Sequence, residues 1–293
     1  MSAVDLSALP APEVLEALDF EDTYQESLGV FREAMGDNWS APLESDPVVK
    51  LIEVGAYNKI GNRARVNDGA KALLLAYAEG GDLEQLAANV NLKRLVVQAE
   101  DTTVFPAIPE VLEEDDALRE RIQLVYEGLT TAGPRNSYIL HARNASGLVA
   151  DATAESPSPA TVVVTVLSLE GMGEASPELL NTVATHLSDD DTRPLGDRLL
   201  VQSAEILPYS ITAILHMTGT GSENETILAE ARSRLAKSVN PRRRLGVEVA
   251  RSGVDAQLHI AGVRRVELVG WQDLLPTKAQ AAYCTGFSVE LGD

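Results

Sequence analysis

The sequence has a single cysteine, Cys284, among its 293 residues, so no disulfide can form within the chain and no thiolate cluster can hold a metal. Aromatic residues make up only 4% of the chain, which argues against a surface that stacks on bases or sugars. The longest apolar runs, residues 72–78 and 162–167, are far shorter than the ~20 residues of a membrane-spanning helix. The first residues lack the basic and apolar segments of a signal peptide. We therefore expect a protein without membrane contact, assembled in a reducing cytoplasm.

Positive charge is scarce in this chain. Lysine and arginine number 24 against 44 aspartates and glutamates, which gives a formal net charge of −20. A chain this acidic repels phosphate backbones, which argues against nucleic acid as its main partner. Residues 1–60 hold twelve acids and three bases, whereas residues 230–270 hold nine bases and four acids. The uneven distribution fits a protein whose ends contact different neighbours, including copies of itself, although two solvated faces would give the same pattern.

The sequence contains only partial matches to known catalytic and metal-binding motifs. The strings GMGEAS and GTGSEN lack the lysine of a P-loop and the third glycine of a dinucleotide-binding turn. In GFSVELG, Glu290 stands where a G-x-S-x-G elbow needs glycine. The string SDDDT at 188–192 lacks the glycine and final glutamate of an EF-hand loop, so a solvated turn is favoured over a weak calcium site. No second histidine or cysteine stands at ligand spacing from His141, His186, His216 or His259. We predict neither an enzyme nor a bound cofactor or metal.

The basic run NPRRRLG occupies residues 240–246. It has the composition of a phosphate contact or of a salt-bridge patch that faces another protein. The net charge of −20 favours the protein contact. Farther along, Cys284 follows Tyr283 in a strand-like segment and is expected to be buried as a small apolar side chain.

The N-terminal segment predicts an amphipathic docking helix. The stiff Pro-Ala-Pro segment at 10–12 fixes an extended entry. After it, Val14, Leu15 and Leu18 share one face of a helix expected over residues 12–35. An isolated helix of this kind is marginal in water, so the segment is expected to gain order when it docks on partner helices.

A second and longer helix is expected over residues 47–79. Asp46 suits its N-cap and Pro47 its first turn, and the Gly-Gly pair at 80–81 marks its end. A continuous helix of this length would measure about 50 Å. Its apolar stripe consists of Val48, Leu51, Ile52, Ala56, Val66, Ala70, Leu73, Leu74 and Tyr77.

Three glycines, at positions 55, 61 and 69, interrupt this second helix. Each costs up to ~1 kcal/mol in a helix interior relative to alanine. We therefore expect either a closely packed neighbouring helix or a kink at these positions. A short helix over residues 82–90 ends this part of the chain.

The rest of the chain predicts two modules that mix helices and strands. Residues 101–111 form a proline-punctuated connector. The middle module reads ααββαβ, from helices at 114–129 and 135–146, hairpin strands at 147–156 and 160–168, a helix at 176–187 and a strand at 197–205. The last module reads βααββ, from a strand at 207–218, helices at 223–239 and 247–259 and strands at 263–270 and 283–291, which suggests a small α+β sandwich. The predicted fold class is an elongated α+β chain with a helical arm over residues 1–95, a middle module over 96–205 and a C-terminal module over 206–293.

Several unusual strings stand in one order along the chain. They include LPAPEVLEALDFE, the 46–90 segment that begins DPVVKLIEVGAYNKIGNRARVNDG, GPRNSYILHAR, SPSPATV, DRLLVQSAE and HIAGVRRVEL. In this order they resemble the baseplate J-like wedge proteins of temperate contractile-tailed phages and of phage-tail-like bacteriocins. The resemblance extends from residue 6 to about residue 287. One departure is the shorter, Trp-containing link GDNWSAPLES between the N-terminal helices, which leaves the 36–46 corner undefined.

The resemblance implies a structural function. Two J-like copies combine with one I-like wedge protein through a shared bundle of N-terminal helices, and C-terminal parts link wedge to wedge around the hub and spike. The expected partners are a second copy within the wedge, the I-like protein, the sheath-initiator protein, and the hub and spike proteins. The particle would be assembled in the bacterial cytoplasm, with this chain resident in its baseplate and taking part in sheath contraction.

The candidate interface residues follow from these segments. The bundle interface is predicted at Val14, Leu15, Leu18, Tyr24, Phe31, Val48, Leu51, Ile52 and Tyr57. The ring interface is predicted at Arg242, Arg243, Arg244, Arg264 and Arg265. Two other functions stay open: a cell-wall or nucleotide-directed hydrolase associated with the tail, and an acidic binder of a basic protein.

Overall fold

The computed structural model describes residues 5–10, 12–39, 43, 45–129, 134–189, 192–194, 196–219, 221, 223–241 and 243–292. The chain forms two compact units, Met1–Lys93 and Arg94–Asp293. The first is helical and the second combines helices with three small sheets, so the predicted α+β class is confirmed. Within the described ranges, no helix combines the length and apolarity needed to cross a membrane.

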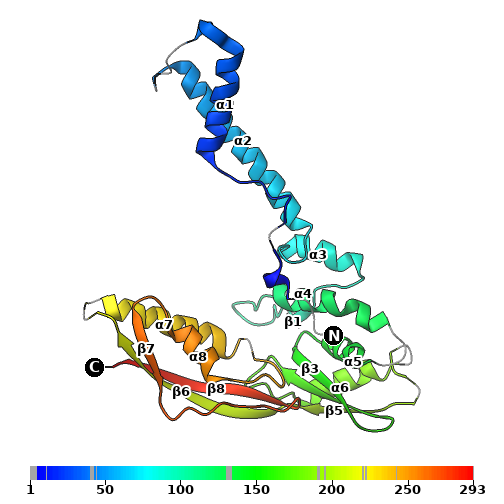
Figure 1. Ribbon diagram of the computed structural model, residues 1–293. Helices are drawn as coiled ribbons and strands as arrows, with labels where there is room; N and C mark the ends of the chain where they lie inside the picture. Colours follow the sequence, from blue (N-terminus) through cyan, green and yellow to red (C-terminus); the bar gives the residue numbers. More distant parts are fainter. Residues whose placement is uncertain are drawn as a thin grey trace. The chain divides into compact units, whose positions relative to one another are not determined.

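The first unit is built around a helical hairpin. Its elements are η1 (Leu6–Ala8), α1 (Phe20–Met35), η2 (Gly36–Asn38), α2 (Pro47–Ala72) and α3 (Gly80–Asn89). Helices α1 and α2 lie side by side (Figure 1) and run antiparallel, since contacts that move toward the start of α1 move toward the end of α2. Asp46 caps α2 as predicted, because its Oδ1 accepts a hydrogen bond of 2.9 Å from the Val48 amide.

The first helix begins eight residues later than predicted from Pro12. Asp19 is its N-cap, with Oδ1 accepting a 2.9 Å bond from the Asp22 amide, and residues 15–19 are not helical. The reason is a side chain far along the sequence: the Asn67 amide accepts from the Glu16 N–H at 2.9 Å and donates to the Glu16 carbonyl at 2.8 Å. This pair of bonds holds Glu16 extended, so Val14, Leu15 and Leu18 do not share a helix face.

The second helix ends at Ala72, about 39 Å from its start at 1.5 Å per residue. The predicted extension to residue 79 is wrong. Beyond Ala72 the chain tightens, because the amides of Leu73 and Leu74 bond to carbonyls three residues back. The helix is continuous across its three glycines, from Pro47 to Ala72.

The middle module has the predicted order ααββαβ, preceded by a small hairpin. The hairpin comprises β1 (Val96–Gln98) and β2 (Val111–Leu112), where a connector was expected. The module comprises α4 (Asp115–Leu124), η3 (Val125–Leu129), α5 (Arg135–Ala145), β3 (Val149–Ser158), β4 (Thr161–Ser168), α6 (Pro177–Leu187) and β5 (Arg198–Ser203). The sheet order is β3-β4-β5, with an antiparallel β3–β4 pair, as predicted for the hairpin, and a parallel β4–β5 pair. Helices α5 and α6 pack on this sheet around Tyr138, Val164, Val166 and Val183.

The C-terminal module has the predicted order βααββ. It comprises β6 (Glu205–Met217), α7 (Glu223–Val239), α8 (Arg251–Leu258), β7 (Val263–Leu268) and β8 (Gln280–Leu291). Strand β6 is central, antiparallel to β7 and parallel to β8. Helices α7 and α8 cover one face of the sheet (Figure 1), around Ile211, Leu215, Leu235 and Leu258. Helix α8 starts later than the predicted residue 247, because Val249 is extended and pairs with Leu274 through bonds of 3.0 and 3.2 Å.

The two modules of the second unit share a buried junction. Leu167, Ala204, Leu245 and Ala281 form one apolar cluster between them. Beside it, Asp151 on β3 accepts a 2.9 Å bond from the Leu245 amide, across 94 positions of sequence. Burial raises the pKa of Asp151, and the Leu245 bond opposes that rise by favouring the charged carboxylate. Only Ala204 separates β5 from β6, so the chain passes directly from one sheet to the other.

The junction predicts a cost for replacing Asp151 by asparagine. Both carboxylate oxygens of Asp151 accept backbone bonds, from Leu245 and from Ala152. An amide offers one acceptor and turns an NH2 group toward the other N–H, so Asp151→Asn should lower the free energy of unfolding by about 1–3 kcal/mol. Denaturant titration of the full chain measures this, with exposed Glu170→Gln as a control expected to change it by less than about 0.5 kcal/mol. Equal effects of the two variants would contradict the role of Asp151.

Candidate partner interfaces

Between α1 and α2, polar bonds accompany a small buried apolar group of Leu28, Val49 and Ala56. Lys59 donates to the Ser27 hydroxyl at 3.1 Å, and Arg63 donates to the Thr23 hydroxyl at 3.3 Å. Arg63 also forms an ion pair of 3.0 Å with Glu16. Together with the Asn67 bonds to Glu16, these contacts form what we call the polar seam.

Apolar side chains instead point away from the seam. We define the outer face of α2 by Leu51, Val54, Gly55, Val66, Gly69 and, at its C-cap, Leu73. Their spacing places them on one side of the helix, opposite buried Val49, Ala56 and Asn67. Leu51 is 71% exposed and Leu73 is 75% exposed. Four large apolar side chains therefore stand in solvent along one line.

Two glycines of this face are not required by any contact with the described residues. A Cβ atom added at Gly55 or Gly69 would meet no atom within 4 Å. Alanine there would favour the helix by up to ~1 kcal/mol at each position. The predicted close packing at these glycines is therefore not made by the described residues of this chain.

The corner between the hairpin helices is closed by aromatic contacts. The Trp39 ring meets the Phe31 ring edge-on, with centroids 5.1 Å apart, and its Nε1 donates to Asp46 at 3.3 Å. At the start of α1, Phe20 and Tyr24 stack with centroids 6.1 Å apart. Trp39 thus connects the end of α1 to the N-cap of α2.

The predicted bundle residues all lie in the first unit, with different exposures. Val14, Leu18, Leu51 and Tyr57 are exposed, whereas Leu15, Tyr24, Phe31, Val48 and Ile52 are half-buried. Val30 and Val54 are also exposed and are not among the predicted residues. Their role as an interface stays a prediction.

The predicted ring arginines fall into two groups, and Arg242 lies outside the described residues. Arg243 and Arg244 belong to the junction. Arg243 donates to the carbonyls of Ser168 and Leu169, both at 3.2 Å, and lies over the Tyr283 ring. Arg244 forms a 3.0 Å ion pair with Glu120. Both side chains thus contact the chain's own second unit, and their contact with a neighbour stays a prediction.

Arg264 and Arg265 lie on β7, at the edge of the C-terminal sheet. Arg264 is exposed and, among the described residues, forms no ion pair. Arg265 donates to Glu267 at 2.8 Å and lies 2.9 Å from the His216 ring nitrogen. These side chains sit on the sheet face opposite α7 and α8, which leaves charged groups on the edge of the module.

Histidines offer no metal site within the described part of the chain, where no group of three or more His, Cys, Asp and Glu side chains could hold an ion. His141 and His186 do approach each other, with ring centroids 6.0 Å apart. Burial lowers the pKa of His141, and His186 lowers it further. Both rings belong to the helices that cover the middle sheet.

Comparison with known proteins identifies the class of this chain. A family model described as the baseplate J-like N-terminal domain matches residues 44–101, and one described as the baseplate J-like central domain matches residues 130–203. Over its full length the chain is 41% identical to baseplate protein J of Escherichia phage P2, in an alignment that covers 100% of this chain and 99% of the relative. The chain therefore belongs to the baseplate J-like family, and the resemblance read from its sequence is confirmed.

The His141 environment predicts a pH dependence. The folded state holds the ring neutral below its ordinary pKa of 6.5, whereas the unfolded chain takes up the proton there. The contribution of His141 to the free energy of unfolding is therefore complete above pH 6.5. It is lost as the pH falls toward the lowered pKa of His141 in the folded state. Between about pH 7.5 and 5.5 the free energy of unfolding should fall less in His141→Gln than in the original chain. The exposed control His259→Gln should behave as the original, and the same fall in all three would refute this assignment.

Proposed function

We propose that this chain is a structural wedge component of the baseplate of a contractile tail, in a phage or in a tail-like bacteriocin. Membership of the baseplate J-like family supports the baseplate role, because the relative from phage P2 is named a baseplate protein. In this proposal two copies join their N-terminal helices with an I-like wedge protein. C-terminal modules link the wedges into a ring around the hub and spike, on which a sheath-initiator protein docks. The role is structural, and no catalytic step is assigned to the chain.

The outer face of α2 carries the proposal of a helical bundle. Full burial of each exposed leucine or valine contributes ~1.5–3 kcal/mol as an upper bound. Covering Leu51, Val54, Val66 and Leu73 therefore outweighs the ~1 kcal/mol that Gly55 and Gly69 each cost the free helix. Glycine without a side chain also lets a partner helix approach the backbone closely. The match of the baseplate J-like N-terminal domain to residues 44–101 covers this face.

The charged edge of the C-terminal module supports the ring contact. Arginines on an edge strand discourage unwanted strand pairing. They also attract carboxylates of an acidic neighbour, and each copy of this chain has a net charge of −20. We assign Arg264 and Arg265 to this contact in preference to Arg243 and Arg244, which fasten the junction: Arg264 is exposed, and Arg265 pairs with Glu267 yet stays 63% exposed.

Leu51→Asp tests the bundle. A charge on the outer face of α2 should weaken binding to the I-like protein by about 30-fold or more, the effect of losing an interface hot spot. The free chain should keep its stability within about 0.5 kcal/mol, because Leu51 contacts mainly solvent. Sedimentation of the mixed proteins and denaturant titration measure the two effects. Leu275→Asp is the matched control, since Leu275 is 73% exposed against 71% for Leu51 but lies in the second unit. Full binding by Leu51→Asp would refute the bundle.

Gly55→Ala tests whether this glycine is required for binding in the bundle and not for the stability of the free chain. In the free chain it should raise the free energy of unfolding by up to ~1 kcal/mol, because alanine favours the helix and has room for its Cβ. In the bundle the same Cβ should hold the partner helix away and reduce binding. Gly253→Ala, which also has open space but lies in α8, serves as the control. A variant with higher stability and undiminished binding would show that Gly55 does not face a partner.

A further inference from the structure

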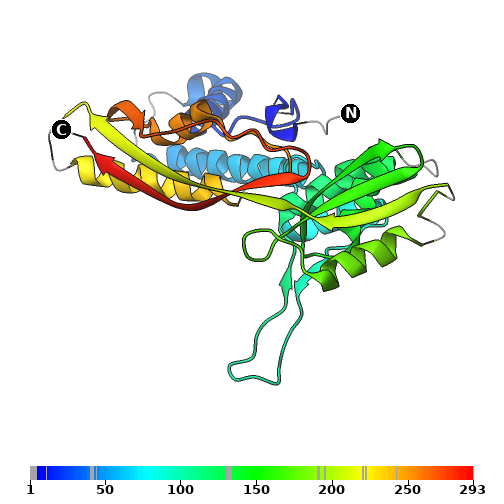
Figure 2. The same cartoon turned by 90° about the horizontal axis from the view of Figure 1, so that it is seen from below.

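The β1–β2 hairpin projects from the second unit as a separate arm. Residues 99–110 connect its strands, and Asp101 and Ile108 exchange two backbone bonds of 2.9 Å within it. Figure 2 shows this hairpin standing clear of both larger sheets of the unit. At its far end the Phe105 side chain is fully exposed, and Val104 beside it is exposed as well. We call residues 96–112 the Phe105 arm.

The root of the Phe105 arm is firmly held. Glu113, directly after β2, is buried and forms an ion pair with buried Arg121 of α4. The same glutamate accepts a 3.0 Å bond from the Leu95 amide, so it joins both strands of the arm to α4. Arg94 adds a 2.6 Å ion pair with Asp115. A two-stranded hairpin is marginal by itself, and these contacts fix the direction in which it presents Phe105.

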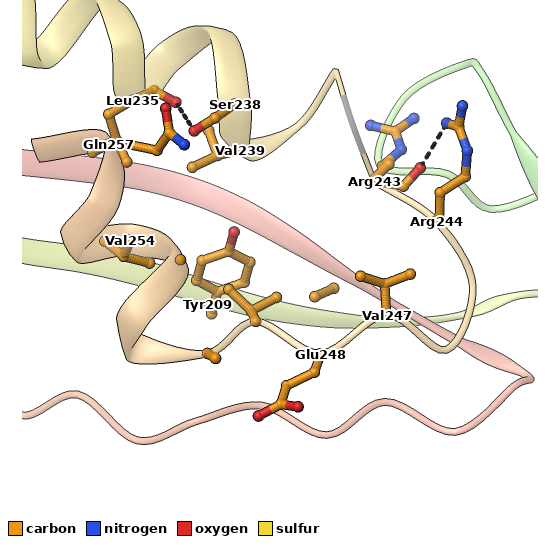
Figure 3. Close-up of a pocket in the computed structure, with 14 residues that line it drawn as sticks. Tyr209, Leu235, Ser238, Val239, Arg243, Arg244, Val247, Glu248, Val254 and Gln257 are labelled. Atoms are coloured by element: carbon orange, nitrogen blue, oxygen red, sulfur yellow. Dashed lines mark hydrogen bonds between the residues drawn. The ribbon is translucent and has the colours of Figure 1, made fainter. Parts of the chain in front are cut away.

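An apolar pocket lies elsewhere on the same unit. It has a volume of about 260 Å³ and is bounded by β6, α7, α8 and the segment that leads into α8. In Figure 3, Tyr209, Val239 and Val254 line its apolar side, with Val247 at one end. A dry cavity of about 150 Å³ lined by apolar side chains already holds a benzene molecule, so this pocket has room for a phenylalanine ring and part of a neighbouring residue.

Tyr209 gives the pocket one unused polar group. Its hydroxyl makes no hydrogen bond to the described residues, and Figure 3 shows the ring directed into the open space. Burial raises the pKa of Tyr209 to about 12, in keeping with apolar surroundings. The hydroxyl is thus available to a backbone carbonyl of an inserted loop.

The Phe105 arm and the pocket are complementary in charge. The arm carries Glu100, Asp101 and Glu110 and contains no lysine or arginine, and neither glutamate forms an ion pair among the described residues. Arg243, Arg244 and Glu248 line one side of the pocket, and Arg244 is paired with Glu120. Arg243 there contacts neutral carbonyls and forms no ion pair with a carboxylate among the described residues. An acidic arm with an aromatic tip therefore fits an apolar pocket that has the Arg243 guanidinium at its rim.

We propose that the Phe105 arm of one copy inserts Phe105 into the Tyr209 pocket of a second copy. The arm does not fill the pocket of its own chain, because Phe105 is fully exposed. The contact joins two different patches, so it is head-to-tail, and repeated with a closing rotation it produces a ring. This inference rests on the proposed function for its setting, since it supplies a ring contact between copies in the baseplate.

Cysteine cross-linking between separate copies tests the contact. Two variants of the full chain, both with Cys284→Ser, carry Val104→Cys beside the tip or Val247→Cys at the pocket. Mixed at high concentration with a short bis-maleimide, they should yield a covalent dimer, whereas each variant alone should yield far less. Adding Phe105→Ala to the first variant should reduce the yield about tenfold, as expected for a lost aromatic anchor. Leu200→Cys, exposed on β5, replaces Val247→Cys as the control and should give little dimer.

Three outcomes would overturn the proposal. They are no dimer above the Leu200→Cys control, a yield unchanged by Phe105→Ala, or efficient cross-linking within one chain that carries both cysteines. Adding Leu51→Asp to both variants separates this contact from the bundle. Cross-linking should persist in that background, so a failure of the bundle would not refute the Phe105 contact. Conversely, normal binding of the I-like protein without a cross-link would refute the Phe105 contact and leave the bundle unaffected.

Discussion

The polar seam between α1 and α2 helps to determine which side chains of the first unit are exposed to solvent. Most helix pairs are held by apolar side chains at their contact, which uses up the apolar stripe of each helix. Here the apolar part is small, Leu28, Val49 and Ala56, and Asn67, Arg63 and Lys59 add hydrogen bonds and an ion pair. Leu51, Val54 and Val66 of α2 are therefore left exposed on the opposite side. A partner that covers them adds its contacts to a hairpin that is already formed, and does not compete with α1.

In the second unit, apolar side chains are buried in the cores and charged side chains join the modules. Its two modules each have a buried core under a pair of helices, and a third apolar cluster joins them. Around that cluster, Asp151, Arg243 and Arg244 satisfy backbone and side-chain groups of the other module. Arg243 and Arg244, which belong to a basic run in the sequence, therefore hold the two modules together. The surfaces that we propose for contact with neighbours are the edge of β7, the Phe105 arm and the Tyr209 pocket.

The success of sequence reasoning depended on how local each signal was. Helix α7 has the predicted bounds, Glu223–Val239, and the hairpin of β3 and β4 forms around the expected prolines, because periodicity and turn residues act over a few positions. The start of α1 was missed because Asn67, 51 residues away from Glu16, replaces the helical bonds of that residue. The Phe105 arm was missed because β1 and β2 are only 3 and 2 residues long and no Asn-Gly or Asp-Gly pair marks a turn. The engagement of Arg243 depends on carbonyls about 75 positions away, which no local pattern reveals.

The direct passage from β5 to β6 has a mechanical consequence. With Ala204 alone between the strands, an extended length of backbone from Arg198 to Met217 runs through two sheets. A force along this backbone would act on its covalent bonds. It would also load in shear the hydrogen bonds of the parallel β4–β5 and β6–β8 pairs. No slack loop is present there to absorb displacement, so tension applied at one sheet reaches the other without delay. A displacement of one sheet is therefore expected to move the other sheet with it.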